Sequence, residues 1–355
     1  MLTFPKPVFW YNLTWQGQTW YETIKRWFLC FCGNKLVIRT CDLFCGVGGS
    51  SRGAAMAGAT PVAGLDMWSL ATDAYAANFK NATTYNMKAS DLKPRTILED
   101  VGEIDLLLAS PECTAHSVAK GKKEGCEKSR ETAFEVIRFA RVLQPRWIVV
   151  ENVIQMQRWA RFDEWKTKLV GLGYKVNSGV LDARFFGTPT SRRRLFVVCD
   201  REREPTLPVE KIETSKTVAD ILGRGESLAA PWKMTQVWNA DRATATLERA
   251  ERAVETLGAK TPFIMVYYGS DGAGGFQQLD RPLRTVTTLD RFAYVRPTKT
   301  GHEMRMLQPT ELAAAMGFPQ EHRLPESTRR EKIKLIGNAV CPRVMAAVVK
   351  TLTIE

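Results

Sequence analysis

Short apolar segments recur along the chain from residue 36 onward, with amphipathic stretches between them. Residues 36–44, 61–65, 104–109 and 147–150 have the length and apolar character of strands buried within a sheet. Residues 132–143 carry apolar side chains at helical spacing. This alternation of strands and helices predicts an α/β fold with a doubly wound, mostly parallel sheet.

Two of the predicted strands lead into residues that can carry out chemistry. The strand over residues 104–109 runs into Cys113, and the strand over residues 147–150 runs into Glu151. In open α/β sheets, ligands and reacting groups gather at the carboxyl ends of the strands. We therefore expect a thiol and a carboxylate to face one crevice, as a nucleophile and an acid.

A glycine-rich loop follows the first predicted strand and contains Gly46, Gly48 and Gly49. Such a loop lets backbone N–H groups approach a ligand closely. The next strand ends at Asp66, about 20 residues later, where a carboxylate can accept hydrogen bonds from ribose hydroxyls. Because the glycine spacing departs from G-x-G-x-x-G, it favours a nucleoside-bearing ligand without a pyrophosphate.

Composition narrows the class of protein further. The 355 residues, of which 45% are hydrophobic, are enough for two domains, and the net charge of +12 favours a polyanionic partner. The eight cysteines include no C-x-x-C pair, and with three scattered histidines they predict reduced thiols and no metal site. The sequence has no apolar run of about 18 residues and no signal-peptide pattern, so we expect a cytoplasmic protein that does not interact with membranes.

The order of these motifs resembles that of the bacterial and phage DNA cytosine-5 methyltransferases, over residues 36–352. Residues 42–49 resemble the S-adenosylmethionine loop of that family, residues 111–113 its nucleophile motif, residues 151–153 its acid motif, and residues 337–342 its last conserved block. The resemblance implies methyl transfer from S-adenosylmethionine to C5 of a flipped-out cytosine in double-stranded DNA. It also implies a covalent adduct of Cys113 at C6 of that base.

The resemblance assigns roles to single residues as well. The implied catalytic residues are Cys113, Glu151, Arg192 and Arg194. The implied cofactor-binding residues are Phe44, Gly46, Gly48, Asp66, Met67, Asp91 and Asn338. A basic loop after the nucleophile, residues 118–130, predicts a mobile DNA-binding segment. The DNA contacts expected there and just before it are those of Ser117, Lys120, Lys122, Lys123 and Arg130. No metal is implied.

The sequence departs from the family pattern close to the predicted nucleophile. Glu112 stands where the family usually has proline, and a carboxylate beside a thiol raises the pKa of that thiol. Thr114 and Thr190 replace two glutamines of the family motifs, which points to an unusual substrate preference. An RNA cytosine-5 methyltransferase of the same fold and a catalytically silent DNA-binding relative are the alternatives.

The predicted organisation has four parts. Residues 1–35 form an aromatic-rich extension, residues 36–203 the catalytic and cofactor-binding domain, residues 204–324 a smaller target-recognition domain, and residues 325–355 a segment that returns to the catalytic domain. Residues 200–280 contain ten Lys or Arg against thirteen Asp or Glu, so we expect most phosphate contacts to come from elsewhere. A helix is predicted over residues 241–257. The sequence does not determine the oligomeric state, for which we expect a monomer.

Overall fold

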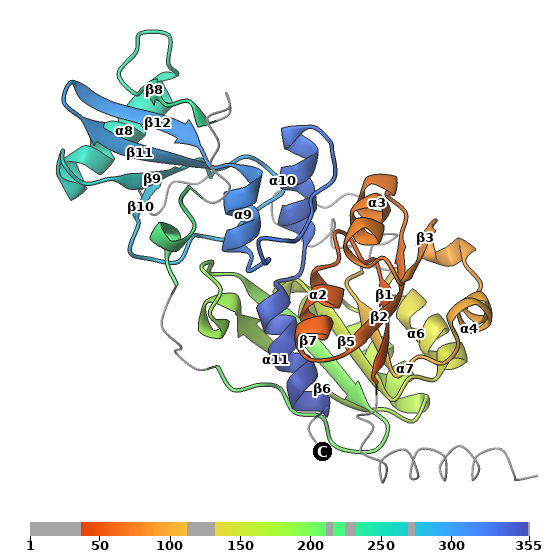
Figure 1. The fold of residues 1–355 in the computed structure, drawn as a ribbon. Coiled ribbons are helices and arrows are strands. Elements are labelled where there is room, and N and C mark those ends of the chain that lie inside the picture. Colours follow the sequence, from red (N-terminus) through yellow and green to blue (C-terminus); the bar gives the residue numbers. More distant parts are fainter. Residues whose placement is uncertain (1–36, 112–131, 211–215, 224–231, 269–273, 354–355) are drawn as a thin grey trace, which may run out of the picture. The chain divides into compact units, whose positions relative to one another are not determined.

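The computed structural model describes residues 37–111, 132–210, 216–223, 232–268 and 274–353. Its larger sheet has seven strands in the order β3-β2-β1-β4-β5-β7-β6 (Figure 1). These strands are β1 (Arg39–Leu43), β2 (Thr60–Asp66), β3 (Thr83–Asn86), β4 (Leu106–Ala109), β5 (Trp147–Asn152), β6 (Lys175–Asp182) and β7 (Arg193–Asp200). Strands β1 to β5 pair in parallel, and β7 runs antiparallel to both β5 and β6. The predicted α/β fold with a mostly parallel sheet is confirmed.

Helices cover the sheet, and this explains why its central strands are apolar throughout. Every residue of β4 and β5 is buried, as expected for strands with both faces covered. Helix α2 packs against α11, and α6 packs against α4 and α7. The bounds are α2 (Gly49–Met56), α3 (Ser69–Asn78), α4 (Pro94–Val101), α6 (Thr132–Leu143), α7 (Phe162–Gly171) and α11 (Pro342–Thr353). The short 3-10 helices η1 (Ala89–Asp91), η2 (Ile154–Arg158) and η3 (Ala183–Phe186) lie in the connections.

Two glycines let α2 approach the C-terminal segment at backbone distance. A Cβ atom on Gly49 would lie 2.2 Å from the carbonyl oxygen of Val340, and one on Gly53 would lie 2.5 Å from that of Pro342. Real Cβ atoms are not found this close to a carbonyl oxygen, so only glycine fits at either position. The start of α2, which follows the glycine-rich loop, is therefore packed directly against residues near the C-terminus.

A second sheet has five antiparallel strands in the order β10-β9-β11-β12-β8. They are β8 (Thr235–Gln236), β9 (Phe263–Val266), β10 (Phe276–Gln278), β11 (Phe292–Thr298) and β12 (Gly301–Met306). Helix α8 (Thr244–Leu257) buries Ala250 and Ala253 in the core of this sheet. The helix predicted over residues 241–257 is thus present, beginning three residues later because residues 240 and 241 form a turn and residue 242 a bend.

A buried ion pair joins the second sheet to the residues that follow it. Arg305 of β12 and Glu311 of α9 (Pro309–Ala315) are 7% and 0% exposed, and their side chains form two hydrogen bonds of 2.8 Å. Glu311 also accepts hydrogen bonds from the backbone N–H groups of Gln308, at 2.7 Å, and Gly223, at 2.8 Å. Gly223 lies three residues after the end of η4 (Val218–Asp220). Both oxygens of the buried carboxylate are therefore satisfied, which burial of a charge requires.

Among the described residues, one helical stretch is long and apolar enough to cross a membrane, Arg329–Thr353. It combines α10 (Arg329–Asn338) with α11, and 72% of its most apolar window is buried inside the structure. Burial of this kind is typical of a helix in a protein core.

Candidate active site

The glycine-rich loop at the end of β1 adopts a backbone conformation that favours glycine. Gly46 and Gly48 have φ angles of 52° and 83°, and Phe44 adopts 60°, which is uncommon for a residue with a side chain. A Cβ atom on Gly48 would also lie 2.4 Å from the ring of Phe79. The backbone N–H of Gly46 donates to Asp66 Oδ2 at 2.9 Å. The structure therefore brings together four of the predicted cofactor residues, Phe44, Gly46, Gly48 and Asp66.

Asp66 stands at the carboxyl end of β2 and organises its surroundings. Its Oδ1 accepts a hydrogen bond from the backbone N–H of Trp68 at 2.9 Å, in addition to the bond from the loop. Burial raises the pKa of Asp66, and these backbone hydrogen bonds oppose the shift. Met67, the next residue, is 61% exposed, so an apolar side chain next to the carboxylate in sequence is accessible to solvent.

The two remaining predicted cofactor residues lie at other elements. Asp91 is exposed at the end of η1, and Asn338 is exposed at the end of α10. Among the described residues, no hydrogen bond joins either side chain to the glycine-rich loop. Asp91 accepts one from Ser90 at 2.8 Å. Lys334 of α10 lies 4.5 Å from the ring of Trp68, which places α10 beside the residues that follow Asp66.

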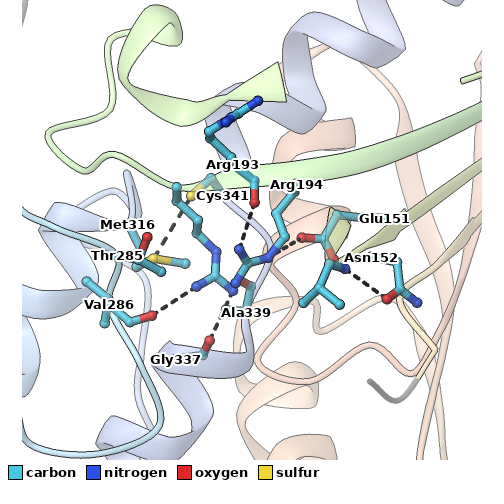
Figure 2. Close-up of polar contacts among 12 residues, drawn as sticks. Glu151, Asn152, Arg193, Arg194, Thr285, Val286, Met316, Gly337, Ala339 and Cys341 are labelled. Carbon is cyan, nitrogen blue, oxygen red and sulfur yellow. Dashed lines mark hydrogen bonds and ion pairs between the residues drawn. The ribbon is translucent and has the colours of Figure 1, made fainter. Parts of the chain in front are cut away.

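Glu151 and Arg194 form an ion pair at the ends of neighbouring antiparallel strands (Figure 2). Arg194 Nε lies 3.3 Å from Glu151 Oε1, and the two side chains are 18% and 8% exposed. Burial raises the pKa of Glu151, and the charges of Arg194 and Arg192 act against that shift. A raised pKa is the direction of shift that a carboxyl group needs to act as a general acid.

The end of β4 is tied to both of its neighbours in the sheet. Ser110 Oγ donates to the carbonyl of Phe44 in the glycine-rich loop at 2.9 Å. Asn152 Nδ2, next to Glu151, donates to the carbonyl of Pro111 at 3.3 Å. Because β4 lies between β1 and β5, the chain leaves this strand between the glycine-rich loop and the buried acid.

Arg192 is placed differently from Arg194, although both were predicted as catalytic residues. It is 4% exposed, and its guanidinium donates to the carbonyls of Val286 at 2.9 Å, Gly337 at 3.0 Å and Ala339 at 3.1 Å. Figure 2 labels these three residues. The contacts of Arg192 therefore run to the backbone of two distant segments.

The residues before Arg192 are joined to the segment around Leu283 by strand-like hydrogen bonds. Ser191 N donates to the carbonyl of Leu283 at 2.8 Å, and Leu283 N donates to that of Pro189 at 2.9 Å. Thr190, which replaces a glutamine of the family motif, is fully buried and donates to the carbonyl of Leu283 at 3.0 Å. Its side chain holds two segments together.

Sequence reasoning missed Asp182, which fixes the backbone ahead of the arginines. Its Oδ1 accepts from the N–H groups of Arg184 and Arg192, at 3.3 and 3.0 Å, and its Oδ2 accepts from Ser191 Oγ at 3.2 Å. An aspartate at a strand end, just before a turn, is the signal that could have found it. His322 was also missed. It reaches the carbonyl of Val47 in the glycine-rich loop at 2.9 Å across 275 positions of sequence, and no local pattern indicates this.

The described thiols do not supply the nucleophile. Burial raises the pKa of Cys41, Cys45, Cys199 and Cys341, all of which are buried and free. A thiol held protonated in this way is inert. The predicted nucleophile Cys113 and its neighbour Glu112 lie outside the described residues, as do the predicted DNA contacts of Ser117, Lys120, Lys122, Lys123 and Arg130 and the extension at residues 1–35. Within the described ranges, no group of three or more His, Cys, Asp or Glu side chains could hold a metal ion.

Comparisons with known proteins match nearly the whole chain. A family model described as C-5 cytosine-specific DNA methylase matches residues 38–353. The type II methyltransferase M.HhaI of Haemophilus parahaemolyticus is 27% identical over 321 residues, which cover 87% of this chain and 92% of that enzyme. The type II methyltransferase M.HgiDI of Herpetosiphon aurantiacus is 28% identical over 254 residues, covering 70% and 80% of the two chains. The solved structure of the methyltransferase EhMeth of Entamoeba histolytica has a similar fold, with a TM-score of 0.65, 16% identity and coverage of 90% and 98%.

Proposed function

Because the chain belongs to the C-5 cytosine-specific DNA methylase family and is a DNA cytosine-5 methyltransferase, we propose that it methylates a flipped-out cytosine through a covalent Cys113 adduct. The observation that carries this proposal is the position of the end of β4. Ser110 and Pro111 are bonded to the glycine-rich loop on one side and to the strand end of Glu151 on the other. A cysteine two residues further on starts from a point between methyl donor and acid.

The glycine-rich loop fits S-adenosylmethionine, which supplies an electrophilic methyl group when bound. The space beside Gly46 is open, since a Cβ atom there would meet nothing within 4 Å. Asp66 offers a carboxylate for ribose hydroxyls, and exposed Met67 offers an apolar surface for the adenine. Phe44, Gly48, Asp91 and Asn338 complete the proposed set; the last two are exposed.

The acid and the arginine would activate the base for attack. Cytosine C5 is a poor nucleophile, so the Cys113 thiolate adds to C6 and the electron pair moves toward N3. Glu151, whose pKa burial raises, would donate a proton to N3, while Arg194 holds Glu151 in place and binds the base O2. C5 then attacks the methyl group, whose bond to the sulfonium sulfur breaks as S-adenosylhomocysteine leaves. A base or water removes the C5 proton, the electron pair left behind restores the C5–C6 double bond and expels the Cys113 thiolate, and N3 returns its proton to Glu151.

The target base has to leave the duplex before Cys113 can reach C6. Unstacking and unpairing cost a few kcal/mol, and protein contacts with the phosphate backbone have to offset that cost. The proposed contacts are those of Ser117, Lys120, Lys122, Lys123 and Arg130, from the basic loop that follows the nucleophile in the sequence.

A trapping experiment tests the covalent step. DNA carrying 5-fluorocytosine cannot release the enzyme after methyl transfer, because no C5 proton can be removed. We expect a denaturation-resistant complex with the wild type and none with Cys113→Ser, while Cys126→Ser serves as the matched cysteine control. Trapping by Cys113→Ser at the wild-type level would refute the proposed nucleophile.

Sequencing for 5-methylcytosine in DNA from expressing cells tests the substrate and reveals the recognition site. Purified enzyme with labelled cofactor, offered DNA and tRNA in parallel, separates the DNA enzyme from an RNA enzyme of the same fold. Methylation of tRNA alone would overturn the proposed substrate. No methylation of either would favour a catalytically silent relative.

Glu151→Gln tests the acid. Positioned general acids contribute about 10²- to 10⁴-fold to rate, so we expect a single-turnover rate at least about 100-fold lower. Binding of S-adenosylhomocysteine should stay unchanged, because Glu151 lies at the strand end opposite the glycine-rich loop across β4. A rate within about threefold of wild type would remove Glu151 from the mechanism.

A further inference from the structure

Arg192 makes a set of contacts that a base-binding arginine would not make. Its guanidinium is buried and donates three hydrogen bonds to backbone carbonyls, those of Val286, Gly337 and Ala339. Arg194, two residues later, is instead partly exposed and paired with Glu151. Arg192 directly precedes β7 and Arg194 is the second residue of that strand. The charges of both arginines act on Glu151, so the two residues lie in the same region but have different hydrogen-bond partners.

The three carbonyls belong to two segments that lie far apart in the sequence. Val286 follows Leu283, which is bridged to Thr190 directly before the arginines. Gly337 and Ala339 flank Asn338, the residue proposed to face the cofactor. Arg192 is thus hydrogen-bonded both to Val286, in the connection between β10 and β11 of the second sheet, and to the backbone on either side of Asn338.

Gly337 shows how closely these two segments approach each other. A Cβ atom at this position would lie 2.3 Å from the carbonyl oxygen of Thr287 and 2.6 Å from the backbone nitrogen of Thr288. The backbone of α10 therefore packs against residues 287 and 288 without room for a side chain. Arg192, directly before β7, is hydrogen-bonded to both of these segments, at Val286 and at Gly337. A planar guanidinium can bond to carbonyls in several directions at once.

The backbone of Arg192 is fixed as firmly as its side chain. Its N–H donates to Asp182 Oδ1 at 3.0 Å, and Thr285 Oγ1 donates to the carbonyl of the preceding residue, Ser191, at 2.8 Å. Both ends of the side chain are therefore held, so its length sets the separation between the start of β7 and the backbone around Asn338.

We propose that Arg192 is a positioning residue that fixes Arg194 and Glu151, on the base side of the site, relative to Asn338 on the cofactor side. This inference rests on the proposed function, because the base and cofactor sides are assigned there. Transfer of a methyl group requires C5 and the donor to meet at close range and in line. A displacement of about 1 Å costs about 100-fold in rate in such a reaction.

Arg192→Lys tests the proposal, with Arg193→Lys, at the next position, as its matched control. Lysine keeps the charge, but its single nitrogen cannot replace both Nη1, which bonds to Val286, and Nη2, which bonds to Gly337 and Ala339. Arg193 is exposed and donates none of these bonds. We expect the single-turnover rate of Arg192→Lys to fall about 10- to 100-fold, with the Kd for S-adenosylhomocysteine within about threefold of wild type. Arg193→Lys should keep the wild-type rate.

The stoichiometry of S-adenosylhomocysteine binding separates this role from a loss of folded protein. A merely structural role would reduce the number of binding sites and leave the rate per occupied site unchanged. Our proposal requires a full set of sites with a slow rate. An unchanged rate per occupied site in Arg192→Lys would overturn it.

A milder variant covers the case in which Arg192→Lys does not fold. Thr285→Val removes only the hydroxyl that holds the carbonyl of Ser191, and we expect a rate per occupied site about 3- to 10-fold below wild type. A wild-type rate in Thr285→Val would then count against the proposal. Wild type and Cys113→Ser are measured alongside. If the wild type fails to methylate DNA, the proposed function fails, whereas a slow variant beside an active wild type concerns Arg192 alone.

Discussion

His322 gives the structure a dependence on pH that a single substitution should remove. The ring is 8% exposed and stacks against Phe318 at 4.5 Å between ring centroids. Nε2 meets the carbonyl of Val47 at 2.9 Å, and Nδ1 accepts a hydrogen bond from Arg52 Nε at 3.4 Å. Burial, followed by the charge of Arg52, lowers the pKa of His322 from 6.5 to about 4. The imidazole is therefore neutral in the folded protein under ordinary conditions.

The direction of the pH effect follows from this lowered pKa. Below pH 6.5 the unfolded chain takes up a proton at His322 and the folded protein does not, so falling pH favours unfolding. The full effect of a shift of this size is about 3 kcal/mol. Between pH 7.5 and pH 5 we expect this group alone to cost the wild type about 2 kcal/mol of unfolding free energy. Below about pH 4 its contribution stops changing.

His322→Gln separates this term from the rest of the protein. Glutamine can donate to Val47 and accept from Arg52, and it does not titrate. Urea unfolding of both proteins at pH 7.5, 6.5, 5.5 and 5.0 should show the wild type losing about 2 kcal/mol more than the variant. All other titrating groups are common to both proteins, so their effects cancel in the difference. Equal losses for the two proteins would refute the reasoning.

Two further predictions concern stability. Gly53→Ala should lower the unfolding free energy by about 1–3 kcal/mol, net of the gain in helix propensity, because the new Cβ atom clashes with the carbonyl oxygen of Pro342. The control Gly171→Ala in α7, where a Cβ atom meets nothing within 4 Å, should be neutral or stabilising by up to about 1 kcal/mol. Equal thermal midpoints for the two variants would contradict this prediction. Glu311→Leu leaves Arg305 as a buried cation without its carboxylate and should cost about 3–5 kcal/mol. The double variant Arg305→Met/Glu311→Leu should cost less in urea unfolding than Glu311→Leu alone, and a larger cost would show that the pair is not the source.

The sequence was sufficient to predict the strands that can be identified from their own residues alone. Residues 104–109 and 147–150 are continuously apolar, and a strand buried on both faces has no other pattern. The carboxyl ends of β4 and β5 could therefore be located before the structure was known. The antiparallel placement of β7 between β5 and β6 could not, because strand direction depends on pairing between residues such as Glu151 and Phe196, which no periodicity records.

The candidate site divides in the same way. The positions of Glu151 and Asp66 at strand ends could be predicted, and the structure places Glu151 in an ion pair with Arg194 and Asp66 in a hydrogen bond with the glycine-rich loop. The difference between Arg192 and Arg194 could not be predicted, since both positions of the motif carry the same side chain. It depends on carbonyls 94 to 147 residues away. The partners of a buried donor are set by tertiary packing.

The contact between α2 and α11 has a consequence for how the enzyme is made. Helix α2 begins at residue 49 and α11 at residue 342, so the ribosome has to synthesise the long stretch between them before the two can meet. Until then, the glycines of α2 face no partner backbone and the loop ahead of them lacks its support. The emerging chain therefore cannot complete the packing behind the glycine-rich loop, which we propose binds S-adenosylmethionine, and products of premature termination that lack α11 should be inactive. Methylation begins only with molecules whose synthesis has run to α11.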